Sequence, residues 1–332
     1  MFRAFTKIFP FAFALLCYSH GGAQDFQKTG TSGFVFLEIP VSARYLGMGE
    51  TGLTLSNAHA DGLFINPALI SLGSSTFSVL ASYSEWYVET THQALGLTYR
   101  LPTVGTLGFQ LVYFDFGEIQ KTRNPFASRN EFGSYIELGT YTAGGLVAGV
   151  SYARQLTDKF SFGSSVKYVR ETIDIEAATN VILDIGFYYD TGFRALFYQG
   201  TGIRSLRLGA FLKDFGLESK YVNEKFKMPQ QLKFGISSDL IGDLSSPNRL
   251  TILAEAVHPN DANERIHLGI ETILLNSLIL RAGYKLNYDE ENLTLGAGLR
   301  FQYNQKSAAF DFSYMNHDYL DTTVRYTLSL EL

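Results

Sequence analysis

The chain has 332 residues, of which 18% are charged and 14% aromatic, and its formal net charge is −5. This length suits two soluble domains or one large barrel, and the negative balance argues against nucleic acid as a partner. A mean hydropathy of +0.02, with 20 Tyr and 27 Phe, is typical of transmembrane barrels, in which only alternate residues face lipid.

Residues 1–23 are predicted to be a secretory signal peptide. Arg3 and Lys7 supply a basic start, residues 8–18 an apolar core, and residues 21–23 small side chains suited to cleavage before Gln24. The apolar run is too short to span a bilayer. The mature chain would keep 25 of the 27 basic residues against 32 acidic ones, a net charge of −7.

The only cysteine, Cys17, lies inside this signal. A lipid anchor on Cys17 is the alternative to simple cleavage, but Leu16 stands where a small residue is expected. The mature chain would therefore have no thiol, which excludes disulfides, thiolate metal sites and cysteine nucleophiles. Export without a later transmembrane helix leaves the periplasm, the outer membrane or the medium as destinations.

Residues 24–72, here called the plug segment, precede the first predicted strand. From Thr31 to Leu72 the sequence lacks sustained alternation and contains two apolar stretches, residues 33–49 and 58–70. Such a segment ahead of a barrel either hangs in the periplasm or folds into the lumen as a plug. Its apolar content favours the lumen.

Alternation of apolar and polar residues predicts about fourteen strands in the rest of the chain. They lie near residues 75–84, 91–101, 106–116, 141–155, 160–172, 179–190, 206–215, 231–241, 249–259, 265–274, 277–287, 293–303, 308–316 and 322–332. Connections 155–159, 274–277 and 303–306 are tight, whereas 117–140, 215–230 and 258–264 are long and polar. Short periplasmic turns and longer extracellular loops are expected of an outer-membrane barrel.

The last strand shows the pattern best, because Val324, Tyr326 and Leu328 alternate with Arg325 and Thr327. Charged residues fall on the inward face of many strands: Arg100, Lys167, Asp184, Lys233, Asp239, Glu255, Glu271, Arg281, Lys285, Arg300, Arg325 and Glu331. A soluble β-sandwich also alternates, but the strand number, the lack of a split into two sheets and the signal favour a barrel. We therefore predict an all-β fold, an antiparallel transmembrane β-barrel formed by residues 73–332 in contact with outer-membrane lipid.

Enzyme motifs are weak. His59, His92, His258, His267 and His317 are scattered without the spacing of a metal site, and no Gly-x-Ser-x-Gly elbow is present. Barrel enzymes assemble their sites from separate strands, so the spacing of residues in the sequence does not exclude an enzyme. The preferred interpretation is a protein that is no enzyme and needs no cofactor or metal.

Residues 36–49, Phe-Leu-Glu-Ile-Pro-Val-Ser-Ala-Arg-Tyr-Leu-Gly-Met-Gly, and then Asn66-Pro-Ala68 resemble the N-terminal signature of PorV/PorQ-type outer-membrane proteins, a branch of the FadL-like barrels. Residues 146–154 and 281–284 resemble strands of the family. The resemblance covers nearly the whole mature chain. The chain departs from the family pattern where Glu50-Thr51 replaces Gly-Ala.

The resemblance implies a fourteen-stranded barrel with an N-terminal plug, in the outer membrane of a Gram-negative-type bacterium. It also implies a role in type IX secretion, in which the barrel binds and hands on secreted proteins with a C-terminal signal domain, alongside other secretion components. Loops 118–137 and 217–230 mix charge with aromatic residues and are the candidate binding surfaces. Their candidate residues are Arg123, Phe126, Arg129, Tyr221, Lys225 and Phe226.

The competing function is passive transport of hydrophobic small molecules, as the FadL resemblance implies. The gate candidates would then be Gly47, Met48, Gly49, Asn66, Pro67 and Ala68, since Pro fixes the backbone and Gly admits torsions closed to other residues. The same residues could instead shape a static plug. An inward face with charges of both signs favours salt bridges over an apolar conduit, and hence partner binding.

Overall fold

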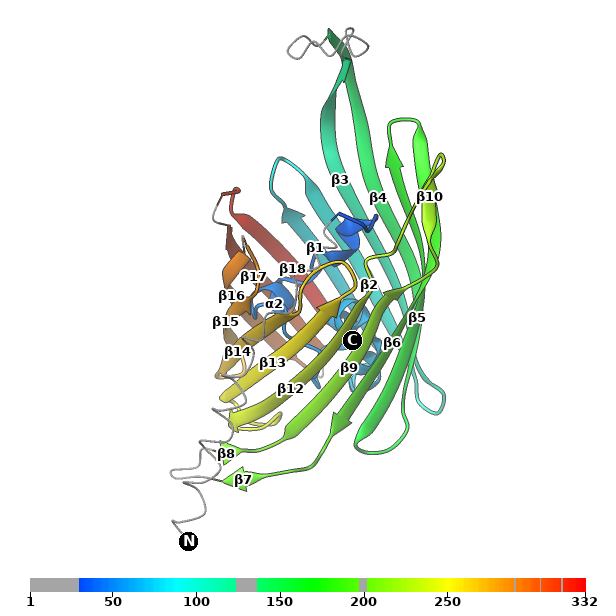
Figure 1. Ribbon diagram of the computed structural model, residues 1–332. Helices are drawn as coiled ribbons and strands as arrows, with labels where there is room; N and C mark the ends of the chain where they lie inside the picture. The colour runs from blue at the N-terminus through cyan, green and yellow to red at the C-terminus, as the bar shows by residue number, and fades with distance from the viewer. Residues whose placement is uncertain (1–29, 124–135, 197–201, 290, 305, 318) are drawn as a thin grey trace, which may run out of the picture.

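The computed structural model describes residues 30–123, 136–196, 202–289, 291–304, 306–317 and 319–332 (Figure 1). Fourteen antiparallel strands close into one barrel in which β1 pairs with both β2 and β18, so the predicted fold is confirmed. The strands are β1 (Phe77–Glu85), β2 (Thr91–Leu101), β3 (Gly105–Arg123), β4 (Ile136–Gln155), β5 (Phe160–Ile173), β6 (Glu176–Asp190), β9 (Leu206–Phe215), β12 (Gln231–Ile241), β13 (Arg249–Pro259), β14 (Arg265–Leu274), β15 (Leu278–Leu286), β16 (Glu291–Tyr303), β17 (Lys306–His317) and β18 (Thr323–Glu331).

Alternation sets which side chains face lipid. Along β18, Tyr326 and Leu328 are 43% and 47% exposed, whereas Arg325 and Thr327 between them are buried. The same pattern continues across the strand pair β1–β18 that closes the barrel. There Ser82 on β1 pairs with Thr327 on β18. A slip of one residue would turn the whole apolar stripe inward, so the alternation fixes the register.

The two ends of the barrel differ. The turn end carries the short connections 102–104, 156–159 and 275–277, and the loop end carries connections 86–90, 216–230 and 260–264. In outer-membrane barrels the short turns are periplasmic, which assigns the loop end to the exterior. Two connections contain small ribbons: β7 (Ala195–Leu196) with β8 (Gly202–Ile203) at the turn end, and β10 (Ser219–Tyr221) with β11 (Glu224–Phe226) at the loop end.

The prediction of a long polar loop over residues 117–140 was wrong at both ends, over residues 117–123 and 136–140, while residues 124–135 lie outside the described residues. β3 continues to Arg123 and β4 begins at Ile136, so the pair forms the hairpin that rises furthest at the loop end (Figure 1). Its outer part has no alternation, because both faces are exposed there. A strand pair beyond the membrane needs no apolar stripe, which is why pattern alone missed it.

The plug segment lies inside the barrel. Its described part forms single helical turns: η2 (Val35–Glu38), α2 (Ala43–Leu46), η3 (His59–Asp61), α3 (Gly62–Ile65) and η4 (Pro67–Ser71). It enters near Lys227 at the loop end, where the Gly33 N–H donates to the Lys227 carbonyl, and leaves at the turn end, where Arg100 donates to the Gly73 carbonyl. Among the described residues, no helix is long and apolar enough to cross a membrane. The predicted signal peptide lies outside the described residues.

Candidate functional site

The gate candidates Gly47, Met48 and Gly49 end the turn of α2. The Ser42 hydroxyl caps this turn by accepting from the Tyr45 N–H at 3.5 Å. Gly49 has a φ of 67°, a left-handed torsion that glycine adopts freely. Its N–H donates to the Thr294 hydroxyl on β16 at 2.8 Å. The turn is therefore fixed both by its own cap and by the barrel wall.

The remaining gate candidates, Asn66, Pro67 and Ala68, lie at the start of η4. This turn contacts the barrel wall at β4, β5 and β6. Asn66 caps this turn, since its side-chain oxygen accepts from the Ala68 N–H at 3.1 Å, and Pro67 occupies the first turn, where a missing N–H costs nothing. The Asn66 amide donates to the carbonyls of Leu53 and Phe187 at 3.0 and 3.1 Å. Asn66 thus ties the plug segment to itself and to β6.

One inward glycine on each of seven strands lets the plug segment approach the wall. We call this set the glycine belt: Gly163 on β5, Gly186 on β6, Gly209 on β9, Gly235 on β12, Gly269 on β14, Gly283 on β15 and Gly296 on β16. A Cβ at Gly283 would overlap the backbone of Met48 and Gly49, and one at Gly163 would overlap the backbone of Pro67 and Ala68. Because backbone cannot move aside cheaply, the belt shapes the lumen to this segment.

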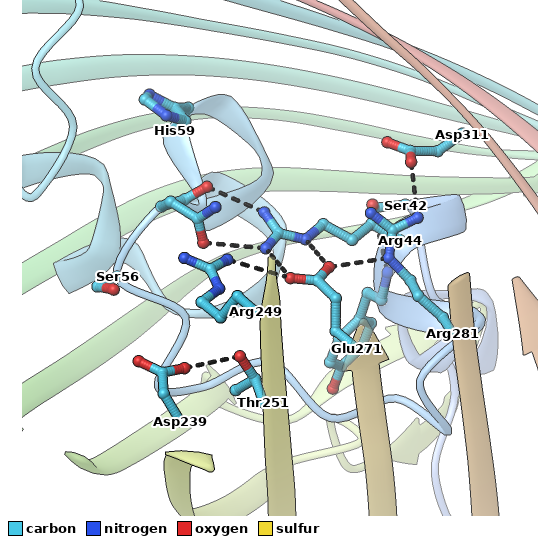
Figure 2. A network of polar contacts seen from close by, with 12 residues as sticks. Ser42, Arg44, Ser56, His59, Asp239, Arg249, Thr251, Glu271, Arg281 and Asp311 are labelled. Atoms are coloured by element: carbon cyan, nitrogen blue, oxygen red, sulfur yellow. Dashed lines mark hydrogen bonds and ion pairs between the residues drawn. The ribbon is translucent and has the colours of Figure 1, made fainter. Parts of the chain in front are cut away.

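A buried network of charges joins the plug segment to strands β13, β14, β15 and β17 (Figure 2). Arg44 on α2 donates from Nε and Nη2 to the two oxygens of Glu271, both at 2.9 Å. Glu271 also accepts from Arg281 Nε at 2.9 Å, and Arg281 Nη1 donates to Asp311 at 2.6 Å. Arg249 lies 3.5 Å from the same Glu271 carboxylate. Glu271 therefore compensates three arginines, one of them from the plug segment.

Two further carboxylates hold the plug segment at its middle. Glu50, a position where the chain departs from the family pattern, accepts from Lys285 at 2.6 Å. Glu255 on β13, between two strands of the glycine belt, accepts from the backbone N–H groups of Gly52 and Leu53. Charged acceptors make the stronger kind of hydrogen bond. The departure at Glu50 thus has a structural partner in Lys285.

Asp61 on the plug segment is buried without a direct charge partner in the described part of the chain. Its Oδ1 has no hydrogen-bond partner there. Burial raises the pKa of Asp61 to about 6, and the attraction of Arg44 only partly opposes this. The group therefore titrates near neutral pH.

The predicted lumen charges lie where alternation placed them. Asp184, Glu255, Glu271, Arg281, Lys285 and Arg325 are buried, whereas Arg100 and Arg300 are partly exposed. Sequence reasoning did not single out the glycine belt. Its sequence signal is one glycine at an inward position on each of seven strands, with β13 the gap between β12 and β14.

The loop candidates divide into two groups. Phe126 and Arg129 lie outside the described residues, and Arg123 is exposed at the end of β3. Phe226 packs against Phe34 of the plug segment and against Tyr221, with ring centroids 5.3 Å apart in both pairs. The Tyr221 hydroxyl donates to Glu171, and Lys225 is exposed. The β10–β11 ribbon therefore holds the entry of the plug segment, a role its composition did not predict.

Two of the cavities beside the plug segment bear on transport. The inner one has about 50 Å³ and is lined by apolar residues such as Phe36 and Val41 together with Lys167, Asp184 and Lys233. The second, here called the mouth cavity, has about 480 Å³ and opens at the loop end beside Trp86, Tyr87 and Tyr288. The polar mouth cavity is therefore the larger of these two spaces.

The sequence matches the family described as type IX secretion system protein PorV over residues 22–258. This chain belongs to the PorV family. A search of curated proteins finds no match.

Solved structures with the same fold as this PorV-family chain include two toluene transporters. TodX of Pseudomonas putida has a TM-score of 0.55 and 14% identity, covering 87% of this chain and 97% of its own. TbuX of Ralstonia pickettii has a TM-score of 0.56 and 15% identity, covering 88% and 97%. A FadL homologue of Pseudomonas aeruginosa has a TM-score of 0.49 and 12% identity, covering 88% and 98%. At these identities the likeness to TodX and TbuX shows the fold alone.

Proposed function

We propose that this outer-membrane barrel binds secreted proteins that carry a C-terminal signal domain and hands them on during type IX secretion. Membership of the PorV family supports the secretion setting. The observation that carries the choice of mechanism is the closed lumen, in which the plug segment is tied by Glu271 and fitted to the glycine belt. A closed lumen leaves the rim and loops for binding partners.

The size of the inner cavity argues against a hydrophobic conduit. An apolar cavity of about 150 Å³ binds benzene, whereas the inner cavity has about 50 Å³ with charged residues in its lining. Apolar molecules gain little from such a space, because its charges would lose solvation without gaining partners. Moving the plug segment aside would also break the Arg44–Glu271 pair.

The loop end offers surfaces suited to a protein partner. The mouth cavity combines aromatic residues with charges of both signs, among them Arg265 and Glu291, and aromatic and Arg residues are enriched at protein interfaces. The β3–β4 hairpin extends beyond the other strands and carries exposed Ile136 and Leu138. Exposed apolar groups on a projecting hairpin fit partner contact better than lipid contact.

The second candidate is passive transport of hydrophobic small molecules. The fold shared with the toluene transporters TodX and TbuX favours it. Gly47, Met48, Gly49 and the Asn66–Ala68 turn would then act as gate residues. Their contacts with the belt make opening costly, so we place transport second.

The test is to compare cells with an in-frame deletion of this chain with cells complemented by the full chain, using mass spectrometry of surface and medium proteins. We expect selective loss of proteins that share one C-terminal domain, with their precursors accumulating in the periplasm. A complementing variant in which residues 118–139 are replaced by Asn-Gly should restore membrane insertion but not secretion. Leu275→Ser, at an exposed position of the turn end, should restore both and serves as the control.

An unchanged set of secreted proteins in the deletion strain would rule out the secretion proposal. Uptake of labelled toluene by the same strains then tests the second candidate. Loss of uptake with an intact secreted set would establish transport instead.

A further inference from the structure

Two adjoining hollows lie on the outer face of the barrel wall. One has about 570 Å³ and is lined by residues of β6, β9, β12, β13 and β14. The other has about 620 Å³ and extends from β8 and β9 across to β16. Ile236 and Ala254 line both, so we treat them as one surface, here called the outer hollow. Each half is larger than the mouth cavity.

Three outward alanines form the floor of the outer hollow, and each pairs in the register with two large apolar residues of the neighbouring strands. The sets are Ala210 with Phe187 and Phe234, Ala254 with Ile236 and Leu268, and Ala282 with Ile270 and Leu295. The six large side chains are 39% to 54% exposed, so they stand out from the wall. Paired side chains lie only about 5 Å apart, so a methyl group between two large side chains leaves a gap.

The wall is thin beneath the outer hollow, because the glycine belt lies on its inner side. Gly209 and Gly235 line one half of the hollow, and Gly269 and Gly283 line the other. Gly209 precedes Ala210 and Gly283 follows Ala282 in the sequence, so at both points the wall carries only a methyl group outside and no side chain inside. A Cβ at either glycine would overlap the plug segment. The outer hollow therefore lies directly over the seated plug segment.

The shape and chemistry of the outer hollow fit a hydrocarbon chain. Its outward lining side chains are aliphatic or aromatic, such as Ile252, Tyr284 and Leu293, and they belong to the face of the wall that meets lipid. The gaps above the alanines are one residue wide, so a flexible chain follows them better than the broad wall of a second barrel. The hollow continues to Leu206 and Leu240 at the turn end, which is the periplasmic side. A chain that enters there belongs to a lipid of the periplasmic leaflet.

We propose that the outer hollow is a binding site for an acyl chain of one glycerophospholipid of the periplasmic leaflet. Lipid tails and the wall are equally apolar, so the preference for this site comes from van der Waals packing. A chain in the hollow contacts the alanine floor and the large side chains beside it, whereas a convex part of the wall offers contact on one side. The bound chain supports the thin wall over the plug segment. This inference is independent of the proposed secretion function.

The test is photolabelling of the purified full chain in phosphatidylethanolamine vesicles, in which a trace of the lipid carries a diazirine on one acyl chain. Mass spectrometry of the digested protein then locates the adducts. We expect about tenfold more adducts on outward residues of β12 to β15 than on those of β1 and β18, the effect of roughly ten additional carbon–carbon contacts. Ala254→Phe and Ala282→Phe fill the floor and should abolish this excess. Ala81→Phe adds the same ring at an exposed position of β1 and should leave the excess unchanged.

Several outcomes would overturn the site or its occupant. Even labelling of all outward strands, or an excess that Ala254→Phe and Ala282→Phe leave unchanged, would show that the hollow holds no particular lipid. Unlabelled phosphatidylethanolamine should dilute the adducts, whereas stronger dilution by lipid A or by free palmitate would refute a glycerophospholipid. In cells, a photoreactive benzoylphenylalanine in place of Ala254 should capture lipid. Capture of a protein and no lipid would show that a partner covers the hollow instead.

Discussion

Arg44 of the plug segment and Glu271 of β14 form a bidentate ion pair, in which the guanidinium donates two hydrogen bonds of 2.9 Å to the carboxylate. They are 227 positions apart in the sequence. The pair is buried on both sides, and Glu271 simultaneously serves Arg281. One carboxylate therefore links Arg44 of the plug segment to Arg281 of the barrel wall.

Glu271→Gln should destabilise the barrel strongly. Removing one partner of a buried charge network costs about 3–5 kcal/mol, because the remaining arginines stay charged and uncompensated. Urea unfolding followed by fluorescence of the single tryptophan, Trp86, measures the loss. Lys121→Ala is the control, since its pair with Asp174 is partly exposed to solvent and should contribute about 0–1 kcal/mol. Equal effects of the two variants would contradict the assigned role of Glu271.

Gly283→Ala should displace the plug segment while the strands still pair. Its new Cβ would overlap the backbone of Met48 and Gly49, whereas a Cβ at Gly144 would meet the Phe114 carbonyl oxygen at 3.3 Å. Proteolysis of the folded protein at residues 31–72 should therefore become faster in Gly283→Ala but not in Gly144→Ala. Unchanged proteolysis in Gly283→Ala would mean that the plug segment adapts to a narrower lumen.

Asp61 should make stability fall as pH rises through the mildly acidic range. Its pKa is 3.8 when unfolded and raised by burial to about 6 when folded, so the folded state binds the proton more tightly. Stability is full below pH 3.8 and declines up to pH 6, by about 3 kcal/mol for a shift of this size. Asp61→Asn removes this dependence, so its unfolding midpoint should exceed that of wild type at pH 7 and not at pH 3.5. A constant difference across this range would refute the raised pKa.

Phe226→Ala should loosen the entry of the plug segment without unfolding the barrel. The Phe226 ring contacts Phe34 and Tyr221, and truncating a packed Phe removes about 3–5 kcal/mol where burial is complete. Hydrogen exchange at residues 33–37 should accelerate, while exchange in β14 and β15 stays slow. Tyr319→Ala, at a position 86% exposed, is the matched control. Equal exchange in both variants would show that the ribbon does not hold the entry.

Strand positions could be predicted from the sequence because lipid imposes a strict rule on them. The predicted 91–101, 231–241 and 249–259 coincide with β2, β12 and β13. The rule ends where lipid ends, so the outer parts of β3 and β4 were missed. The β7–β8 and β10–β11 ribbons were missed for a different reason, since strands of two or three residues are too short to show alternation.

The candidate site was only partly predictable. The inward charges followed from alternation, but their partners did not, because a pair such as Lys285 and Glu50 depends on how the plug segment is folded. Single helical turns such as α2 are too short for a helical period to be read. The sequence predicts Gly47 and Gly49 as gate residues, whereas close approach to Gly283 and Gly296 is what their positions require.

The glycine belt bears on the order in which this barrel is made. The Ala43 N–H donates to the Thr327 hydroxyl, 284 positions later, and five glycines of the belt follow residue 200. The plug segment is synthesised first, yet its binding surface exists only after the final strands arrive. Such distant contacts make folding slow. The sheet must stay open until synthesis ends, and seating of the plug segment then coincides with the pairing of β1 and β18.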